Sequence, residues 1–228
     1  MRPSRSLAGT FIALAFALAG GAQAATITDG FTFSVASGSG NTSIGDHFHS
    51  NTGGSFGNPA GKAEVGRFGG EGVRGLSEYN LTGLATASSA FVTFNVFKAG
   101  GLFAGTNDFP FTGTIKVDGY AGNNSEDISD YEAASIGAVG SFGTGGLVVG
   151  GILSFDITAL LNAALANGDT SLGIRLIADP LNDRGAWTFD TFRLTTDNQT
   201  SVVPVPAGLP LMLTGLVVLG YRSFRRRP

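Results

Sequence analysis

Two histidines separated by one residue, in Asp46-His47-Phe-His49, form the clearest start of a metal site in this sequence. Side chains two residues apart on a strand point to the same face, so both imidazoles can reach one ion. Zinc needs three or four converging ligands. Because the chain has no cysteine and no third histidine, the others would be carboxylates such as Asp46 or Glu64. The alternative, which the sequence favours, is that both histidines are polar residues of a loop before residues 51–54.

An acidic segment in the middle of the chain offers hard oxygen ligands. Its carboxylates and amides are Asp118, Asn123, Asn124, Glu126, Asp127, Asp130 and Glu132. Calcium takes six to eight oxygens from such groups, so the segment is the best candidate for a calcium site, and calcium is the one cofactor proposed for it. The spacing is not that of an EF-hand, and a solvated acidic loop is the commoner role of such a segment.

Aromatic rings that stack on sugars are few. Outside the C-terminal segment there are Trp187, Tyr79, Tyr120 and Tyr131. Trp187 and Tyr131 are the candidate sugar-binding residues, and burial in the core is the alternative for each.

Motifs for catalysis are missing or lack their context. The one G-x-S-x-G match, at residues 53–57, lies in a glycine-rich stretch with no strand-to-helix turn predicted, so it is no nucleophile elbow, and there is no cysteine nucleophile. Gly70, Gly72 and Gly75 match G-x-G-x-x-G, but that motif binds dinucleotides only between a strand and a helix of a βαβ unit, and the pattern predicts none here. We therefore expect no enzyme and read the match as a glycine-rich turn.

Composition narrows the class of protein. The 228 residues include 36 glycines and 18 phenylalanines, and only 14% are charged. Between residues 25 and 203, eight Lys and Arg stand against seventeen Asp and Glu, a net charge of −9, which repels phosphate backbones and excludes general nucleic-acid binding. Without cysteine, the folded part depends on its core and not on disulfides.

The elements that would position these residues are mostly strands. Apolar and polar residues alternate with the short period of a strand in seven segments: 26–35, 63–68, 89–97, 112–120, 147–155, 171–178 and 186–195. The apolar positions of the last segment change parity after Asp190, which predicts a bulge or burial on both faces.

One helix is expected over residues 156–168, with Asp156 as N-cap and Gly168 as its end. Glycine-rich stretches at 38–61, 100–105 and 137–151 are predicted to be connections. The pattern predicts a single all-β domain over residues 25–199, built as a β-sandwich or jelly roll with one short helix.

The first 24 residues have the layout of a secretory signal peptide. Two arginines precede an uncharged run from residue 7 to 20, and the small residues Ala22 and Ala24 flank Gln23. Cleavage by signal peptidase is expected after Ala24. The run of fourteen residues is too short for the ~20 that span a bilayer.

The last part of the chain, residues 200–228, reads as a transmembrane helix with a basic end. Residues 202–221 carry no charge and are followed by a basic stop. Its arginines are Arg222, Arg225, Arg226 and Arg227. Eighteen helical residues from 207 to 224 would cover ~27 Å. The arginines would remain on the cytoplasmic side after export, as the positive-inside tendency requires.

The junction before this span carries a specific motif. Its residues are Val203, Pro204, Val205, Pro206 and Ala207. Followed by an apolar span and arginines, the motif resembles the VPLPA-type variant of the PEP-CTERM sorting signal, with Val205 in place of Leu. The resemblance covers about the last 27 residues. It implies export by a Gram-negative bacterium, a transient inner-membrane anchor, processing by an exosortase, and a final place on the cell surface or in the extracellular matrix.

A second resemblance involves the middle of the chain. Three short phrases are similar to motifs of DNRLRE-type jelly-roll domains, which are relatives of carbohydrate-binding modules. They are residues 64–68, residues 74–81, and residues 155–160 followed by 172–176. This similarity spans about 120 residues. Residues 131–132 are all that remains of the aromatic-rich segment such domains carry in mid-chain.

These observations together predict an exported, non-catalytic surface or matrix protein. The alternative is a carbohydrate-binding module for extracellular polysaccharide. A polysaccharide hydrolase is a third and weaker hypothesis, because sequence alone places no pair of carboxylates at the required separation.

Overall fold

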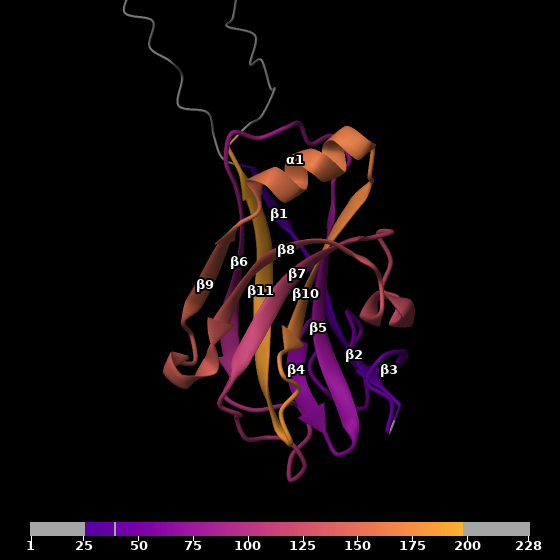
Figure 1. Ribbon diagram of the computed structural model, residues 1–228, viewed down its shortest axis with the longest axis vertical. Helices are drawn as coiled ribbons and strands as arrows, with labels where there is room; N and C mark the ends of the chain where they lie inside the picture. The colour runs from indigo at the N-terminus through magenta and orange to yellow at the C-terminus, as the bar shows by residue number, and fades with distance from the viewer. Residues whose placement is uncertain (1–25, 39, 198–228) are drawn as a thin grey trace, which may run out of the picture.

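The computed structural model describes residues 26–38 and 40–197, which form eleven strands, one α-helix and two short 3₁₀ turns (Figure 1). The first six strands are β1 (Thr26–Asp29), β2 (Phe31–Ser37), β3 (Gly45–Ser50), β4 (Ala63–Phe68), β5 (Glu71–Asn80) and β6 (Ala90–Lys98). The others are β7 (Thr114–Ala121), β8 (Ser135–Gly143), β9 (Ile152–Asp156), β10 (Ser171–Ala178) and β11 (Gly185–Thr196). The helix is α1 (Thr158–Asn167), and the 3₁₀ turns are η1 (Ile128–Tyr131) and η2 (Thr144–Gly146).

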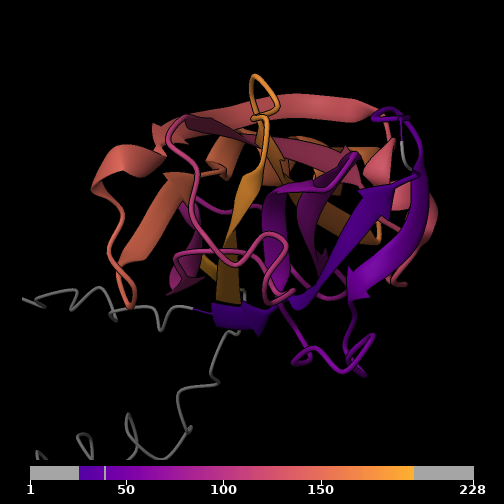
Figure 2. The same cartoon turned by 90° about the horizontal axis from the view of Figure 1, so that it is seen from below.

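All strand pairs are antiparallel, and the strands join into one curled sheet. The hydrogen-bonded order is β8-β7-β10-β5-β4-β11-β6-β9, with β1 added to β11, β2 to β5, and β3 to β2. Seen from below, the sheet curls back on itself into a near-barrel (Figure 2). The predicted all-β class is confirmed.

The interior of the curl is apolar and rich in phenylalanine. Phe94 lies at its centre and contacts four other rings, with ring-centroid distances of 4.6 to 6.1 Å. Leu161 and Ala164 of α1 also belong to this core. A smaller cluster packs η1 against the sheet, made of Phe33, Val35, Leu76, Tyr120 and Tyr131. The fold therefore has one main core and a second layer under η1.

Each alternating segment contains at least part of a strand, although β9 covers only residues 152–155 of the predicted segment 147–155, and two of the three predicted local signals hold. The first segment is divided at Gly30 into β1 and β2. The register shifts between Asp190 and Arg193, and Thr191 has a φ of 54°, so the predicted bulge is confirmed. Gly168 ends α1 with a left-handed φ of 79°. Asp156 is not the N-cap residue itself, which is Ile157, but its Oδ1 accepts the amide of Thr158.

Two of the three predicted glycine-rich connections are partly wrong. The stretch 38–61 contains all of β3, and the stretch 137–151 contains most of β8. The ten-residue strand β5 was not predicted either, and it includes Gly72 and Gly75. Gly75 marks close packing here, because a Cβ on it would lie 2.7 Å from Ala63 Cβ. Residues 100–105 do form a connection, as expected.

The two ends of the domain lie together. Thr26 at the start of β1 pairs with Thr196 at the end of β11. The turn between β4 and β5 lies at the opposite end (Figure 1). Within the described residues, no helix combines the length and apolar character needed to cross a bilayer. The predicted signal peptide and C-terminal span lie outside those residues.

Candidate metal centre

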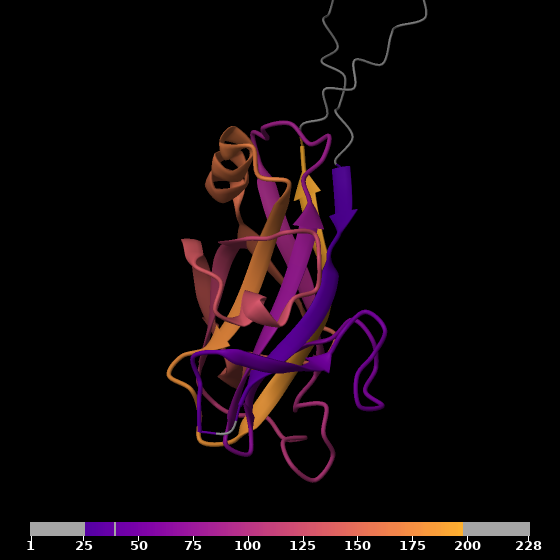
Figure 3. The ribbon, with the colours of Figure 1, turned by 90° about the vertical axis from the view of Figure 1, so that its right-hand side faces the viewer.

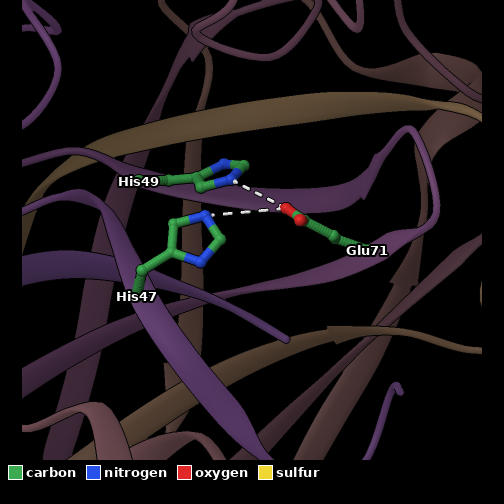
Figure 4. Close-up of side chains that lie close together, drawn as sticks. All are labelled: His47, His49 and Glu71. Carbon is green, nitrogen blue, oxygen red and sulfur yellow. Dashed lines mark ion pairs between the residues drawn. The ribbon is translucent and has the colours of Figure 1, made fainter. Parts of the chain in front are cut away.

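Strand β3 presents both histidines to the first residue of β5. β3 is an edge strand that pairs only with β2 among the described strands. It runs across one side of the domain, next to β2 (Figure 3). His47 and His49 are two residues apart, so their imidazoles share one face of β3. Glu71 follows the tight turn after β4 and points between the two rings (Figure 4).

The three side chains converge on one small space. His47 Nε2 lies 3.6 Å from Glu71 Oε2, and His49 Nε2 lies 3.8 Å from the same oxygen. One ligand atom from each residue lies within 4.8 Å of the others. Two ligands bound about 2.0–2.2 Å from a tetrahedral ion are separated by about 3.3–3.5 Å. The two distances from Nε2 to Glu71 Oε2 are therefore too long for good hydrogen bonds but close to the separation of two ligands of one ion.

Each imidazole has a carboxylate beside its other nitrogen. His47 Nδ1 lies 3.3 Å from Asp46 Oδ2, and His49 Nδ1 lies 3.3 Å from Glu64 Oε2. A carboxylate that accepts a hydrogen bond from Nδ1 favours the tautomer that leaves the Nε2 lone pair free. Asp46 is in position to do this for His47, whereas Glu64 lies near His49 Nδ1 without a hydrogen bond. Both Nε2 atoms then face Glu71.

Without a bound ion, the burial of these polar side chains costs free energy. His49 and Glu64 are fully buried. Neither ring nitrogen of His49 nor Oε2 of Glu71 has a hydrogen-bond partner among the described residues. Glu64 accepts the amide of Leu102 and the side-chain amide of Asn107. Buried polar atoms without partners cost free energy, and a cation between them would remove that cost.

Three phenylalanines surround the histidines and form an aromatic rim made of Phe56, Phe68 and Phe103. The ring of Phe103 lies 4.6 Å from that of His49, and Phe68 lies 5.1 Å from it on another side. Phe56 meets the ring of His47 edge-on at 6.0 Å. Apolar groups around a metal site limit water access and fix the orientation of its ligands.

The structure corrects the preferred interpretation of the histidines. They lie on a strand and not in a loop. Asp46 and Glu64, the carboxylates expected as ligands, lie beside the Nδ1 atoms and are not part of the converging set, whose carboxylate is Glu71. Glu71 was missed as a ligand. It is the first variable residue of the G-x-G-x-x-G match, so the only local signal was a carboxylate in a glycine-rich turn. Its convergence with β3 depends on tertiary structure.

The residues predicted to bind calcium are engaged with the protein itself. Asp118 forms an ion pair with Arg175, and Asp127 caps η1 by accepting the amide of Ser129. Glu126 and Glu132 accept the backbone amides of Thr52 and Gly45. Asn123 accepts the amide of Ser125, while the amide of Asn124 donates to Glu78.

Asp130 accepts the amide of Asp127 and lies in a buried acidic environment. Burial, followed by the charges of Glu78 and Asp127, raises the pKa of Asp130 to about 7. In the described part of the chain, His47, His49 and Glu71 are the one set of three His or acidic side chains with converging ligand atoms. Calcium binding by the acidic segment stays a prediction.

The two candidate sugar-binding rings are buried. Trp187 is 5% exposed, and its Nε1 donates to the carbonyl of Phe111. Tyr131 is 1% exposed and lies under the guanidinium of Arg74, 4.0 Å from its carbon. Neither ring presents a face to solvent, which stacking on a sugar requires.

The export residues lie outside the described residues. This applies to Ala22 and Ala24 of the signal peptide, to the motif at 203–207 and to the four arginines of the basic stop. Their predicted roles are neither supported nor contradicted by the fold.

Comparison with known proteins adds no family. No protein-family model and no curated protein matches this chain.

Proposed function

We propose that this chain is an exported bacterial surface or extracellular-matrix protein whose β domain binds one divalent transition-metal ion through His47, His49 and Glu71. The observation that carries the metal-binding part is the convergence of these three side chains on one space, with a carboxylate beside the second nitrogen of each imidazole. The proposed role is binding and not catalysis.

The donor set favours zinc or a similar ion over calcium. Two imidazole nitrogens and one carboxylate oxygen suit zinc, copper and nickel, whereas calcium and magnesium prefer sites made of oxygen alone. Neutral imidazole is the usual histidine ligand, and the carboxylates beside Nδ1 leave Nε2 as the nitrogen of each ring that faces Glu71.

Export is supported by the sequence at both ends of the chain and agrees with the arrangement of the domain. The start of β1 and the end of β11 are paired, and the β4–β5 turn lies at the opposite end of the domain (Figure 1). In a protein anchored beyond residue 197, this turn would therefore lie at the end of the domain farthest from the anchor. Glu71 directly follows that turn. A domain held this way would present the metal site outward.

The carbohydrate-binding alternative has no specific observation in its favour, because Trp187 and Tyr131 are buried. We also propose that the domain is related to DNRLRE-type jelly-roll domains. The all-antiparallel pairing agrees with such a relationship, but the described strands join into one curled sheet and not into the two separate sheets of a jelly roll.

Metal binding is tested on the purified full chain in detergent. After dialysis against zinc, elemental analysis should find about one ion per chain, and titration calorimetry should give a single site. At a free zinc concentration of 100 times Kd, the free energy of unfolding should rise by ~2.7 kcal/mol.

Two variants and a control make the test specific. His49→Ala and Glu71→Ala should each lower zinc affinity at least tenfold. Asp108→Asn changes an exposed carboxylate on the loop between β6 and β7 and should leave affinity unchanged. Equal zinc binding by all four proteins would contradict the proposed site.

A further inference from the structure

The candidate metal centre has a closed side and an open side. His49 and Glu64 are fully buried beneath it. On the other side, the His47 side chain is 32% exposed, and Phe56 in the loop after β3 is 70% exposed. An ion held by the three ligands would therefore face solvent next to His47 and Phe56.

The described residues leave a coordination position to be filled. Zinc takes four ligands, and the converging set supplies three. The two remaining nearby carboxylates, Asp46 and Glu64, lie beside the Nδ1 atoms of the imidazoles, not at the Nε2 side. The fourth donor would come from solvent or from another molecule.

Local charge favours a neutral donor. Three carboxylates adjoin the site, those of Glu71, Asp46 and Glu64. Within the described residues, none of the three forms an ion pair with a lysine or arginine. With a divalent ion bound, the immediate surroundings keep a net charge of −1, which disfavours an anionic ligand such as a carboxylate or phosphate.

The aromatic rim favours a fourth ligand whose donor atom belongs to a planar aromatic ring. Phe56 and Phe103 have ring centroids 6.4 Å apart, and Phe68 lies 4.7 Å from Phe103. The loop that carries Phe56 is held against β3, because Asn58 Nδ2 donates to the carbonyl of His49. A planar aromatic donor could pack edge-on or face-on against such rings while its nitrogen reaches the ion.

We infer that the metal centre binds the imidazole of a histidine from a peptide or protein partner as its fourth ligand. This inference rests on the proposed metal-binding function. The donor is not a second copy of this chain, because the only two histidines in the sequence, His47 and His49, are already ligands.

Cobalt(II) reports the coordination of the ion directly. The purified full chain is loaded with cobalt, its metal content is measured, and its visible absorption is followed during titration with imidazole, acetate, Gly-His-Gly or Gly-Ala-Gly. Imidazole and Gly-His-Gly should shift the cobalt bands saturably without removing the ion. Acetate and Gly-Ala-Gly should produce at least tenfold weaker changes.

The role of the rim is tested with Phe56→Ala and a matched control, Phe91→Ala, which removes a partly exposed ring on β6. With cobalt at measured saturation in both variants, imidazole affinity should fall several-fold in Phe56→Ala only. Bound cobalt whose spectrum does not respond to imidazole, or responds equally to acetate, would overturn the inference and leave the proposed function standing. Failure to bind cobalt or zinc would overturn both.

Discussion

Asp130 is the residue whose protonation most directly links this fold to pH. It lies in η1 close to Glu78 of β5, with Asp127 in the same turn and the phenol of Tyr120 and the guanidinium of Arg175 nearby. Its pKa of about 7 in the folded protein compares with an ordinary value of 3.8. Between these values the folded protein holds a proton that the unfolded chain has lost. Stability should therefore fall as pH rises through this window.

Replacing Asp130 by Asn removes this titration while keeping an oxygen that can accept the amide of Asp127. We expect the free energy of unfolding of Asp130→Asn to decrease less than that of the wild type between pH 5 and pH 8. Urea unfolding at both pH values measures the difference. An identical pH dependence in the two proteins would show that Asp130 does not titrate in this range.

Glu64 is expected to act on the metal through His49. Loss of such an outer carboxylate typically costs 10–100-fold in metal affinity, so Glu64→Gln should weaken zinc binding by about this factor. Zinc competition with a chelating dye measures it, with Asp108→Asn as control. If only the metal-free melting temperature changed, Glu64 would be a structural residue and not a positioning one.

Trp187 is expected to contribute to stability. Removing a buried tryptophan typically costs ~3–5 kcal/mol, so Trp187→Ala should lower the free energy of unfolding by that amount. Chemical denaturation of the variant beside Phe91→Ala, a partly exposed ring, provides the measurement. Unchanged stability would contradict a contribution of the buried Trp187 ring to the core.

At the scale of elements, the acidic segment supports the strand that carries the metal ligands. Glu132 Oε2 accepts the amide of Gly45 at the start of β3, and Glu126 Oε1 accepts the amide of Thr52 just beyond its end, both at 2.9 Å. Because β3 pairs only with β2 among the described strands, these bonds help to fix both of its ends.

Removing both carboxylates should therefore weaken metal binding without touching a ligand. For Glu126→Ala with Glu132→Ala we expect zinc affinity to fall about fivefold to tenfold, about 1 kcal/mol or slightly more. The double Gln variant keeps the acceptor oxygens and should lie near the wild type. Calorimetry at one pH compares the three proteins, and equal affinities would remove this role from the acidic segment.

Strand prediction succeeded in segments with few glycines and failed for strands that lie within glycine-rich stretches. β4 and β10 match their predicted ranges, whereas β3 and most of β8 were assigned to connections. In this fold, glycines such as Gly75 lie inside strands because the adjacent strand leaves no room for a Cβ. Sequence cannot distinguish that use of glycine from its use in turns.

At the scale of the whole molecule, export and display remain to be tested in the native host. Because Val205 replaces the Leu of the sorting motif, we expect Val205→Leu to be processed faster and Pro204→Ala with Pro206→Ala to accumulate unprocessed in the inner membrane. Pulse-labelling and fractionation into inner membrane, surface and medium, with intact mass of each species, measures this. Untrimmed protein dissolved in the cytosol would contradict export altogether.

The sequence alone determined the all-β class, because alternation of apolar and polar residues depends only on strand geometry. It also determined the predicted export ends, since hydrophobic length and flanking charge are properties of a contiguous segment. The tertiary structure decided the metal centre. His47 and His49 are separated from Glu71 by more than twenty residues, and only the packing of β3 beside the β4–β5 turn brings their ligand atoms to one point.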